Sequence, residues 1–411
     1  MVNWNEYLNK AISCKCGRKH QCNIKHVDIG TNVIAKIADY IKEEKFENIC
    51  IVADIHTIKV AGDKVYEVLN GIGRTYSEFI FDDEELIPNE LNIGRLFTHI
   101  PNDCDFVIAI GSGVINDLMR FVSKKMNVPY AIVATAPSMD GYASAVSPLI
   151  VDGFKITYEG LGFPWAIIGD VDILKNAPTH MIASGAGDIF GKYICLIEWK
   201  LSNIVNGEYY CPEIVKLMQT AVNTVAAAAD NGIAQRDPQA IASVMEGLVW
   251  AGIGISYSGN SRPASGCEHQ MGHFWEMMFL QNYHRHDIEH GTFVGVAAIV
   301  ALHVYKEAVK LLENSDKYDT KPFDKAKWEE KIVSVYGKCN DSILDLENKA
   351  HKNDIEKSAE RMKNVFAHKD EIIELMKTLP DIDVMIKRMK KIQEPYMPKQ
   401  IDITPELLRN A

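Results

Sequence analysis

Hydrophobic and polar positions follow two different periods in the first part of the chain. Short β-branched runs predict strands, and they lie at residues 48–56, 76–83, 105–113 and 129–138. Stretches with apolar residues every three or four positions predict helices between them, at residues 31–46, 57–73, 89–100 and 114–127. Strands that alternate with helices form a parallel sheet covered on both faces. The pattern predicts a Rossmann-like α/β domain that binds ligands at the carboxyl ends of its strands.

The pattern changes near residue 180, after which β-rich runs nearly vanish. Long helical periodicities follow, for example at residues 221–235, 294–313, 327–338 and 370–391. We therefore expect two domains. Residues 1–178 would form an α/β domain, and residues 179–411 an all-helical domain.

Composition and charge narrow the class of partner. The chain has 411 residues, 47% of them hydrophobic, and a formal net charge of −11. This acidic balance argues against nucleic acid or a membrane as the partner, so an anionic substrate would need local Lys or Arg. The N-terminus lacks a signal-peptide pattern, and no run approaches the roughly 18 apolar residues that span a bilayer. Nine cysteines without framework spacing suit a reducing compartment, so we expect a soluble cytoplasmic protein.

One cysteine-rich stretch, CKCGRKHQC, contains Cys14, Cys16, His20 and Cys22. Four soft ligands in nine residues could bind zinc, but the spacing is not a standard one. A turn around Gly17 with ordinary reduced cysteines is the favoured interpretation.

A glycine-rich turn joins a strand to a helix at residues 105–121. Gly111 and Gly113 would let backbone amides approach a phosphate at the start of the helix. The motif departs from G-x-G-x-x-G, because the third glycine position holds Asn116, so a βα turn without a ligand is equally consistent. Asp54, at the end of an earlier strand, could bind a ribose hydroxyl or cap a helix.

Small polar residues follow the strand at 129–138. They are Thr135, Ser138, Asp140 and Ser144, placed where a parallel sheet exposes its ligand face. A turn held by local side-chain hydrogen bonds is the alternative. Lys155, further along, could face an anionic ligand or water.

Acidic and basic residues share the expected start of the helical domain. Asp188 and Lys192 are one helical turn apart. A helix cap or an i,i+4 ion pair would explain them without a functional role.

Histidines are densest between residues 269 and 290. His269 and His273 would lie on one face of a helix, and five histidines within this region favour a metal or acid–base site. Arg262, just before them, is a candidate clamp for an anion.

Five segments in order carry a resemblance to a known family. They are GSGVINDLMRF, TAPSMDGYASAVSPL, GAGDIFGKYICLIEW, SRPASGCEHQMGHFWEM and HGTFVGV. Together they resemble the glycerol-1-phosphate dehydrogenases, in particular the bacterial AraM-type branch of the dehydroquinate-synthase-like, iron-containing alcohol dehydrogenase superfamily. The resemblance implies a dehydroquinate-synthase-like fold.

The resemblance also implies roles for individual residues. The metal ligands would be Asp188, His269 and His290 rather than the pair His269 and His273, and His273 would line the same cavity as a catalytic residue. Asp140 would bind substrate and take part in catalysis. The cofactor set would comprise Asp54, Gly111, Ser112, Gly113, Asp117, Thr135, Ser138 and Ser144.

The activity implied is a metal-dependent, NAD- or NADP-linked reduction of dihydroxyacetone phosphate to sn-glycerol 1-phosphate, with a place in phospholipid metabolism. Zinc, nickel or iron(II) would fit the ligands. Lys155, Lys192 and Arg262 are the candidates to bind the substrate phosphate. Asp54 favours NAD, because a carboxylate repels a 2′-phosphate. The superfamily also suggests a homodimer or larger homo-oligomer.

Three other functions are weighed against this one. A glycerol or other alcohol dehydrogenase of the same superfamily would act on an unphosphorylated substrate. A dehydroquinate-synthase-like lyase would recycle NAD within each turnover. A non-catalytic scaffold would have no physical need for three metal ligands and a glycine turn.

Overall fold

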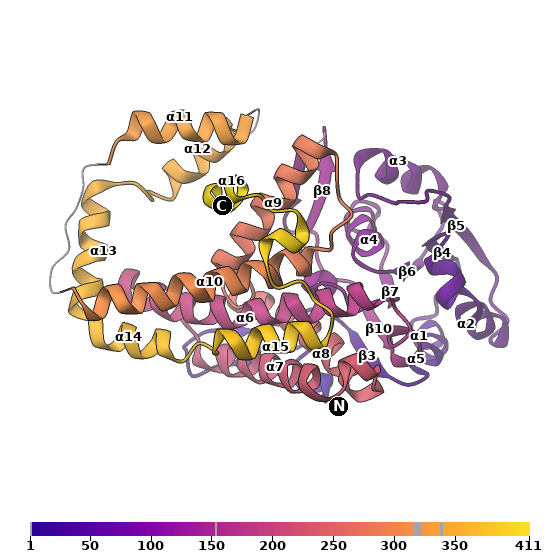
Figure 1. The fold of residues 1–411 in the computed structure, drawn as a ribbon. Coiled ribbons are helices and arrows are strands. Elements are labelled where there is room, and N and C mark those ends of the chain that lie inside the picture. Colours follow the sequence, from indigo (N-terminus) through magenta and orange to yellow (C-terminus); the bar gives the residue numbers. More distant parts are fainter. Residues whose placement is uncertain (1, 153, 316–322, 338–339) are drawn as a thin grey trace.

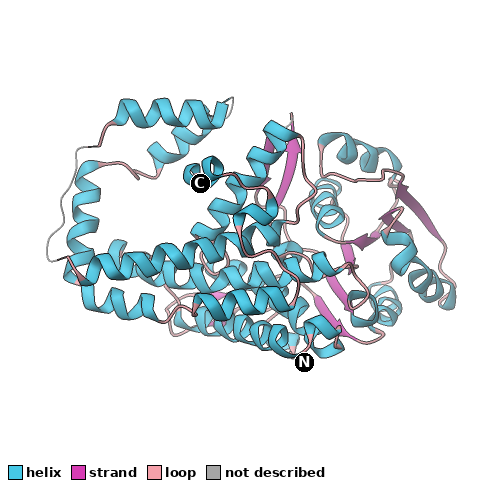
Figure 2. Ribbon diagram, in the orientation of Figure 1, coloured by secondary structure: helices cyan, strands magenta, loops and turns pink. Residues whose placement is uncertain are grey.

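The computed structural model describes residues 2–152, 154–315, 323–337 and 340–411. A parallel sheet of six strands occupies one side of the molecule and helices occupy the other (Figures 1 and 2). The strands are β3 (His26–Gly30), β4 (Ile49–Asp54), β5 (Tyr76–Phe81), β6 (Phe106–Gly111), β7 (Tyr130–Ala134) and β10 (Ala166–Asp170). Their order is β3-β10-β7-β6-β4-β5, and every pairing is parallel. The predicted α/β fold is confirmed.

Helices cover both faces of this sheet. They are α1 (Ile37–Glu44), which follows the 3-10 turn η2 (Val33–Lys36), and α2 (Thr57–Gly71), α3 (Glu90–His99), α4 (Gly113–Met126) and α5 (Val171–Leu174). Successive residues of β4 belong to different hydrophobic clusters, with Ile51 in one and Val52 in the other. Burial on both faces explains why these strands are nearly continuous apolar runs.

The winding of the sheet reverses between β4 and β6. The chain passes outward from β4 to β5 and then returns to add β6 on the opposite side of β4. Such a switch point leaves a crevice at the carboxyl ends of the two strands. Asp54 and Gly111 end β4 and β6, so both lie beside this crevice.

Beyond residue 178 the described residues are helical apart from the connections between elements. The elements there are α6 (Thr179–Asn206), α7 (Pro212–Asn231), η4 (Ile233–Gln235), α8 (Pro238–Ser258), α9 (Cys267–Tyr283), α10 (His290–Glu313), α11 (Lys325–Tyr336), α12 (Asn340–Lys349), α13 (Ile355–Ala367), α14 (Lys369–Lys377), α15 (Ile382–Lys391), η6 (Pro398–Ile401) and α16 (Pro405–Asn410). The expected all-helical second domain is thereby confirmed. The periodic stretch at 370–391 forms two helices rather than one, because Pro380 cannot continue α14.

The N-terminal segment packs on the helical side of the molecule. The hairpin of β1 (Ile12–Ser13) and β2 (Lys19–His20) follows the turn η1 (Trp4–Glu6). The Trp4 ring lies 5.0 Å from that of Trp250 on α8. In Figure 1 the N-terminus lies below α7 and α8, close to the edge strand β3. The division at residue 178 stays a prediction, and these first residues belong spatially to the second part.

A second hairpin and a short 3-10 turn lie between β7 and β10. The turn is η3 (Asp140–Ala143), and the hairpin pairs β8 (Ser147–Val151) with β9 (Phe154–Tyr158). This region connects the sheet to α9 and α8, and it contributes residues to the site described below.

Two helices, α8 and α10, are long and apolar enough to meet the length and hydropathy of a membrane span. Neither helix contains an uninterrupted apolar run of that length, because Ser, Gly and His interrupt the apolar residues, so the sequence pattern did not indicate a span. The apolar window of α8 is 89% buried and that of α10 is 56% buried. Both helices pack inside the helical domain, as core helices of soluble proteins do.

Candidate active site

Three helices bring Asp188, His269 and His290 together. Asp188 lies on α6, His269 in the first turn of α9, and His290 at the first position of α10. One ligand atom from each lies within 4.8 Å of the others. This is the set that the family resemblance implies, and not the His269/His273 pair alone.

Buried glutamates orient both imidazoles. The Nδ1 atom of His269 lies 2.8 Å from Oε1 of Glu268, and that of His290 lies 2.7 Å from Oε1 of Glu276. A carboxylate on one ring nitrogen fixes the tautomer and leaves the other nitrogen as a metal ligand. Two imidazoles and a carboxylate leave coordination positions open, as catalytic metals require. The donor set therefore fits a divalent metal ion.

Lys192 joins the cluster from the next turn of α6. Its Nζ donates to Asp188 Oδ1 at 2.7 Å and to Asp140 Oδ2 at 2.6 Å, and it lies 3.3 Å from His269 Nε2. Burial by itself would lower the pKa of Lys192, but the two aspartates outweigh burial and raise it. The predicted i,i+4 ion pair is present, and it lies inside the site rather than at the surface.

The cluster favours positive charge at its centre. Burial by itself would raise the pKa of Asp188, yet Lys192 and the two histidines hold it well below its usual range. Burial and Lys192 would lower the pKa of His269, but its bonds to Asp188 and Glu268 raise it to about 9. The carboxylates of Asp140, Asp188, Glu268 and Glu276 face only two ammonium groups here, those of Lys155 and Lys192. A divalent cation would balance this charge.

A glycine allows α6 to approach the loop that carries Asp140. A Cβ at Gly185 would lie 1.9 Å from the carbonyl oxygen of Pro137, so any larger residue would push the helix away. The approach lets the backbone N–H of Asp140 donate to Asp188 Oδ2 at 2.9 Å. Asp188 is an interior residue of α6 and not a helix cap.

His273 lies at the solvent side of the cluster. Its ring stacks on that of His290 at 5.1 Å, its Nδ1 lies 3.3 Å from Oε2 of Glu276, and 47% of its side chain is exposed. Lys155 of β9 donates to the same glutamate oxygen at 2.5 Å. Burial lowers the pKa of His273 to about 4, together with the Lys155 ammonium and against the effect of Glu276.

The glycine turn lies at the switch point of the sheet. Gly111 ends β6, Ser112 is the N-cap of α4 and Gly113 is the first residue of that helix. A Cβ at Gly111 would lie 2.5 Å from Cβ of Ile115, so only glycine permits this tight passage. The Ser112 side chain makes no capping bond, which leaves the first N–H groups of α4 facing the crevice.

Three other predicted cofactor residues, Thr135, Ser138 and Ser144, follow β7 in the chain. The backbone N–H of Thr135 donates to Gly111 O at 3.1 Å, and Ser138 O accepts a bond from Ser184 at 3.0 Å. Ser144 bonds locally to the backbone of Val146. The side chains of Thr135, Ser138 and Ser144 are buried. The local hydrogen bonds of Ser144 match the alternative interpretation, a turn held by its own side chains.

The two predicted cofactor aspartates have structural partners. Oδ1 of Asp54 accepts from the N–H groups of His56 and Thr57, both at 2.8 Å, so it holds the start of α2 as the capping alternative expected. Asp117 pairs with Arg120 at 2.7 Å. Burial raises the pKa of Asp117 to about 6, although Arg120 opposes the change.

Arg262 does not lie with the other candidate phosphate ligands. Its guanidinium pairs with Glu208, with Nε to Oε1 and Nη2 to Oε2 both at 2.9 Å. Glu208 follows the end of α6 at Asn206, which lies about 27 Å from Asp188 at the usual helical rise. The expectation that Arg262 contacts the substrate is wrong for this structure. The loop 259–266 runs from that far end toward the site, a direction that the sequence does not reveal.

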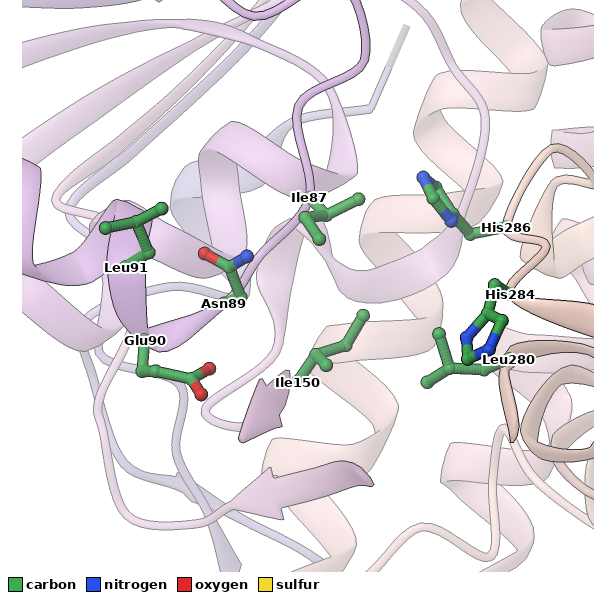
Figure 3. A pocket seen from close by; sticks show the side chains of 8 residues that line it. All are labelled: Ile87, Asn89, Glu90, Leu91, Ile150, Leu280, His284 and His286. Atoms are coloured by element: carbon green, nitrogen blue, oxygen red, sulfur yellow. The ribbon is translucent and has the colours of Figure 1, made fainter. Parts of the chain in front are cut away.

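Two of the five clustered histidines belong to a different feature. His284 and His286 line a cavity of about 550 Å³ with Ile87, Asn89, Glu90, Leu91, Ile150 and Leu280 (Figure 3). Leu280 lies two helical turns beyond His273 on α9. The figure shows the cavity between residues of the sheet domain and those at the end of α9, at the rim of the contact between the domains. None of the metal-ligand triad lines it.

Sequence reasoning missed three contributors. Glu276 holds His273, His290 and Lys155 together, and its position three residues after His273 was the available signal. Glu268 holds Nδ1 of His269, and its place directly before that histidine was the signal. Arg120, buried on α4, donates to the carbonyls of Gly141 and Val146 and so holds the loop that carries Asp140.

Comparisons with known proteins show what this chain is similar to. Residues 28–178 match the iron-containing alcohol dehydrogenase family. Glycerol-1-phosphate dehydrogenase [NAD(P)+] of Halalkalibacterium halodurans is 35% identical over 308 residues, which are 74% of this chain and 76% of the relative. The protein of the same name from Geobacillus stearothermophilus is 30% identical over 99% of this chain and 92% of its own length.

Solved structures show the same fold at lower identity. Glycerol dehydrogenase from Schizosaccharomyces pombe aligns with a TM-score of 0.59 at 16% identity, over 91% of this chain and 93% of that one. NADH-dependent butanol dehydrogenase A from Thermotoga maritima aligns with a TM-score of 0.62 at 14% identity, over 98% and 90%. With curated relatives at 30–35% identity over most of its length, the chain belongs to the glycerol-1-phosphate dehydrogenases, NAD(P)-dependent oxidoreductases within the iron-containing alcohol dehydrogenase superfamily.

Proposed function

We propose that this protein reduces dihydroxyacetone phosphate to sn-glycerol 1-phosphate with NADH or NADPH, reversibly and with one divalent metal ion. The observation that carries the proposal is the convergence of Asp188, His269 and His290 beside Asp140 and Lys192. The names and the extent of the similar proteins support the same activity.

The metal-binding residues would be Asp188, His269 and His290. A divalent ion held there supplies Lewis acidity that polarises a carbonyl oxygen, and zinc, nickel and iron(II) all suit the ligands. The nicotinamide supplies the hydride, and the turn Gly111–Gly113 with the first amides of α4 would bind its pyrophosphate.

The chain's own residues orient the substrate and move a proton. Asp140, fixed by Lys192, would accept a hydrogen bond from the substrate hydroxyl. Because Glu276 engages Nδ1 of His273, Nε2 of this half-exposed ring would take up a proton from solvent and pass it to the substrate oxygen. Lys192 stays bonded to both aspartates and holds them in place.

Binding of the substrate phosphate would fall to Lys155. It is partly exposed on β9 and pairs with Glu276, which is also bonded to both His273 and His290. A phosphate that contacts Lys155 would gain a charge-assisted hydrogen bond. Because the other two candidates are engaged elsewhere, an unphosphorylated polyol remains the second candidate substrate.

We also propose the setting in which this activity operates. The acidic chain with reduced cysteines suits the cytoplasm, with neither nucleic acid nor membrane as partner, and the product suits phospholipid metabolism. A homodimer or larger assembly is proposed because α10 exposes Val304 and Leu311 at 60% and 68%.

The test follows the absorbance of reduced nicotinamide. Protein stripped by a chelator is offered NADH or NADPH with dihydroxyacetone phosphate, or with dihydroxyacetone, before and after addition of nickel, zinc or iron(II). Metal-restored oxidation with the phosphorylated ketone supports the proposal. Equal turnover of dihydroxyacetone would replace it with a polyol dehydrogenase, and no oxidation with either ketone would reject both.

A further inference from the structure

A second cluster of metal-binding side chains lies far from the active site. Cys14, Cys16, His20 and Cys211 each place one ligand atom within 4.8 Å of the others. Three come from the β1–β2 hairpin near the N-terminus, and Cys211 comes from the loop after α6. We propose that these four residues bind a structural zinc ion that fastens the N-terminal hairpin to the helical domain.

The distances within the cluster match a tetrahedral zinc site. Cys14 Sγ lies 3.6 Å from Cys211 Sγ, and His20 Nε2 lies 3.4 Å from Cys16 Sγ and 3.5 Å from Cys211 Sγ. Zinc–sulfur bonds of about 2.3 Å and zinc–nitrogen bonds of about 2.0 Å in a tetrahedron give edges of about 3.8 and 3.5 Å. A disulfide needs sulfurs about 2.05 Å apart and would use only two of the four residues.

The surroundings prepare the ligands for a metal. His20 is buried, and its Nδ1 lies 2.8 Å from the carbonyl oxygen of Tyr257, so that Nδ1 carries the proton and Nε2 presents its lone pair to the sulfurs. The Tyr209 hydroxyl lies 3.3 Å from Cys16 Sγ and can donate to it. The Arg18 guanidinium lies 3.4 Å from the centroid of the Tyr209 ring, so it places a positive charge next to the tyrosine that contacts Cys16.

Local chain geometry sets the spacing of the ligands. Gly17, with φ of +87°, turns the chain between Cys16 and His20, and its N–H donates to Cys14 O at 3.1 Å. Each strand of this hairpin has only two residues, too few to be stable alone in water. A metal bond to Cys211 gives the hairpin the support that its own hydrogen bonds lack.

Cys22, which the sequence groups with this motif, is excluded from the cluster. Its side chain is buried in the main hydrophobic core, and burial raises the pKa of its thiol to about 11. The fourth ligand is instead Cys211, which follows it by 189 positions in the sequence. All four ligand positions are filled by protein, as in structural rather than catalytic zinc sites. Zinc binding would displace the protons of three thiols into solvent.

The test measures metal content and cobalt spectra of the full-length protein, purified with a reductant. We expect Cys14→Ser and Cys211→Ser each to lose one zinc equivalent that Asp188→Asn keeps. Cys22→Ala is the matched control, since it removes a neighbouring cysteine outside the cluster and should keep that equivalent. Tyr209→Phe should weaken zinc binding about 10- to 100-fold, the usual effect of losing a partner of a metal ligand.

Cobalt(II) added to the Asp188→Asn variant provides a readout that does not depend on whether the cysteine variants fold. Thiolate-to-cobalt charge-transfer bands with the intense visible bands of a tetrahedral ion would support the site. Their absence, with all thiols reduced and titratable, would overturn it. A Cys14–Cys211 disulfide in the freshly isolated protein would overturn it as well, in favour of a redox link.

Discussion

The two metal-ligand clusters differ in every property that separates catalytic from structural sites. The active-site cluster offers a carboxylate and two imidazoles, with a second row of carboxylates behind them and one half-exposed histidine beside them. The N-terminal cluster offers three sulfurs and one nitrogen at tetrahedral spacing. Open positions at the first cluster leave room for substrate oxygens, whereas the second has no position left.

The way in which each cluster is assembled also differs. Asp188, His269 and His290 belong to long helices of the domain core, which fix them by packing. Cys14, Cys16 and His20 belong to a short hairpin, which contacts the helical domain through Cys211, Tyr209 and Tyr257. Loss of metal should therefore abolish catalysis at the active-site cluster and local order at the N-terminal cluster.

The largest effect is expected at Asp188. Asp188→Asn removes the carboxylate charge that opposes Lys192 and a bound cation, and the lost metal stabilisation corresponds to several kcal/mol, or about a 10³-fold decrease in kcat/KM. Metal analysis and steady-state assays would measure both losses. Asp230→Asn, which breaks a surface pair with Arg388, is the control and should leave both unchanged. Full activity of Asp188→Asn would remove the distinction between the two clusters.

Glu394 tests how much a buried carboxyl group near the active-site cluster destabilises the fold. It is 2% exposed beside Gly187, and burial raises the pKa of its carboxyl to about 8, against the effect of Thr292 and with help from Glu289. The folded state therefore holds a proton that the unfolded state has released, so stability falls as pH rises from about 4.5 to about 8. Glu394→Gln should remove this decline and gain about 2–4 kcal/mol above pH 8, relative to its effect at pH 5.

Urea unfolding of both proteins across this pH range, followed by circular dichroism, would measure the difference. Glu406→Gln, in the first turn of α16, serves as the exposed control and should show no comparable pH dependence. Parallel stability curves for Glu394→Gln and the parent protein would show that the carboxyl is ionised in the folded state.

Most of the fold was predictable because its strands are buried on both faces. The runs that became β4, β6 and β7 were recognised by continuous apolar residues, and the edge strand β5, which contains Ser77 and Glu78, by its remaining apolar residues. β3 and β10 were missed. Asp28 interrupts the short β3, and β10 contributes only Ala166–Ile168 before Gly169 and Asp170. These short strands are defined by pairing with each other and with β7, which is tertiary information.

The site residues that belong to a sequence motif were predictable. Those whose contact partners lie far away in the sequence were not. Asp188, His269 and His290 followed from the resemblance and do converge. Arg262 was assigned wrongly because the sequence does not show which end of α6 its loop meets. Cys211 escaped notice for the same reason, since only the fold brings it to the N-terminal hairpin.

A third prediction concerns Glu276, which orients the metal ligand His290 but is not itself a proposed ligand. Glu276→Gln keeps the shape but weakens the hold on His290 and removes the negative charge opposite Lys155. We expect metal affinity at the active site to fall about 10- to 100-fold. Metal titration of stripped protein would measure this, with zinc at the cysteine cluster as an internal control that should not change. Equal weakening at both clusters would indicate a global loss of folding.

The smallest expected effect is on the choice of substrate and not on metal binding. Lys155→Ala should raise KM for dihydroxyacetone phosphate about tenfold or more, because one charge-assisted hydrogen bond to the phosphate is lost, while KM for dihydroxyacetone changes little. Arg262→Ala is the matched control, since it removes a cation already paired with Glu208 far along α6 and should affect neither KM. Equal increases for both ketones would assign Lys155 to the support of Glu276 alone. An increase in KM for dihydroxyacetone phosphate alone would show that Lys155 of β9 binds the substrate phosphate at the active-site cluster.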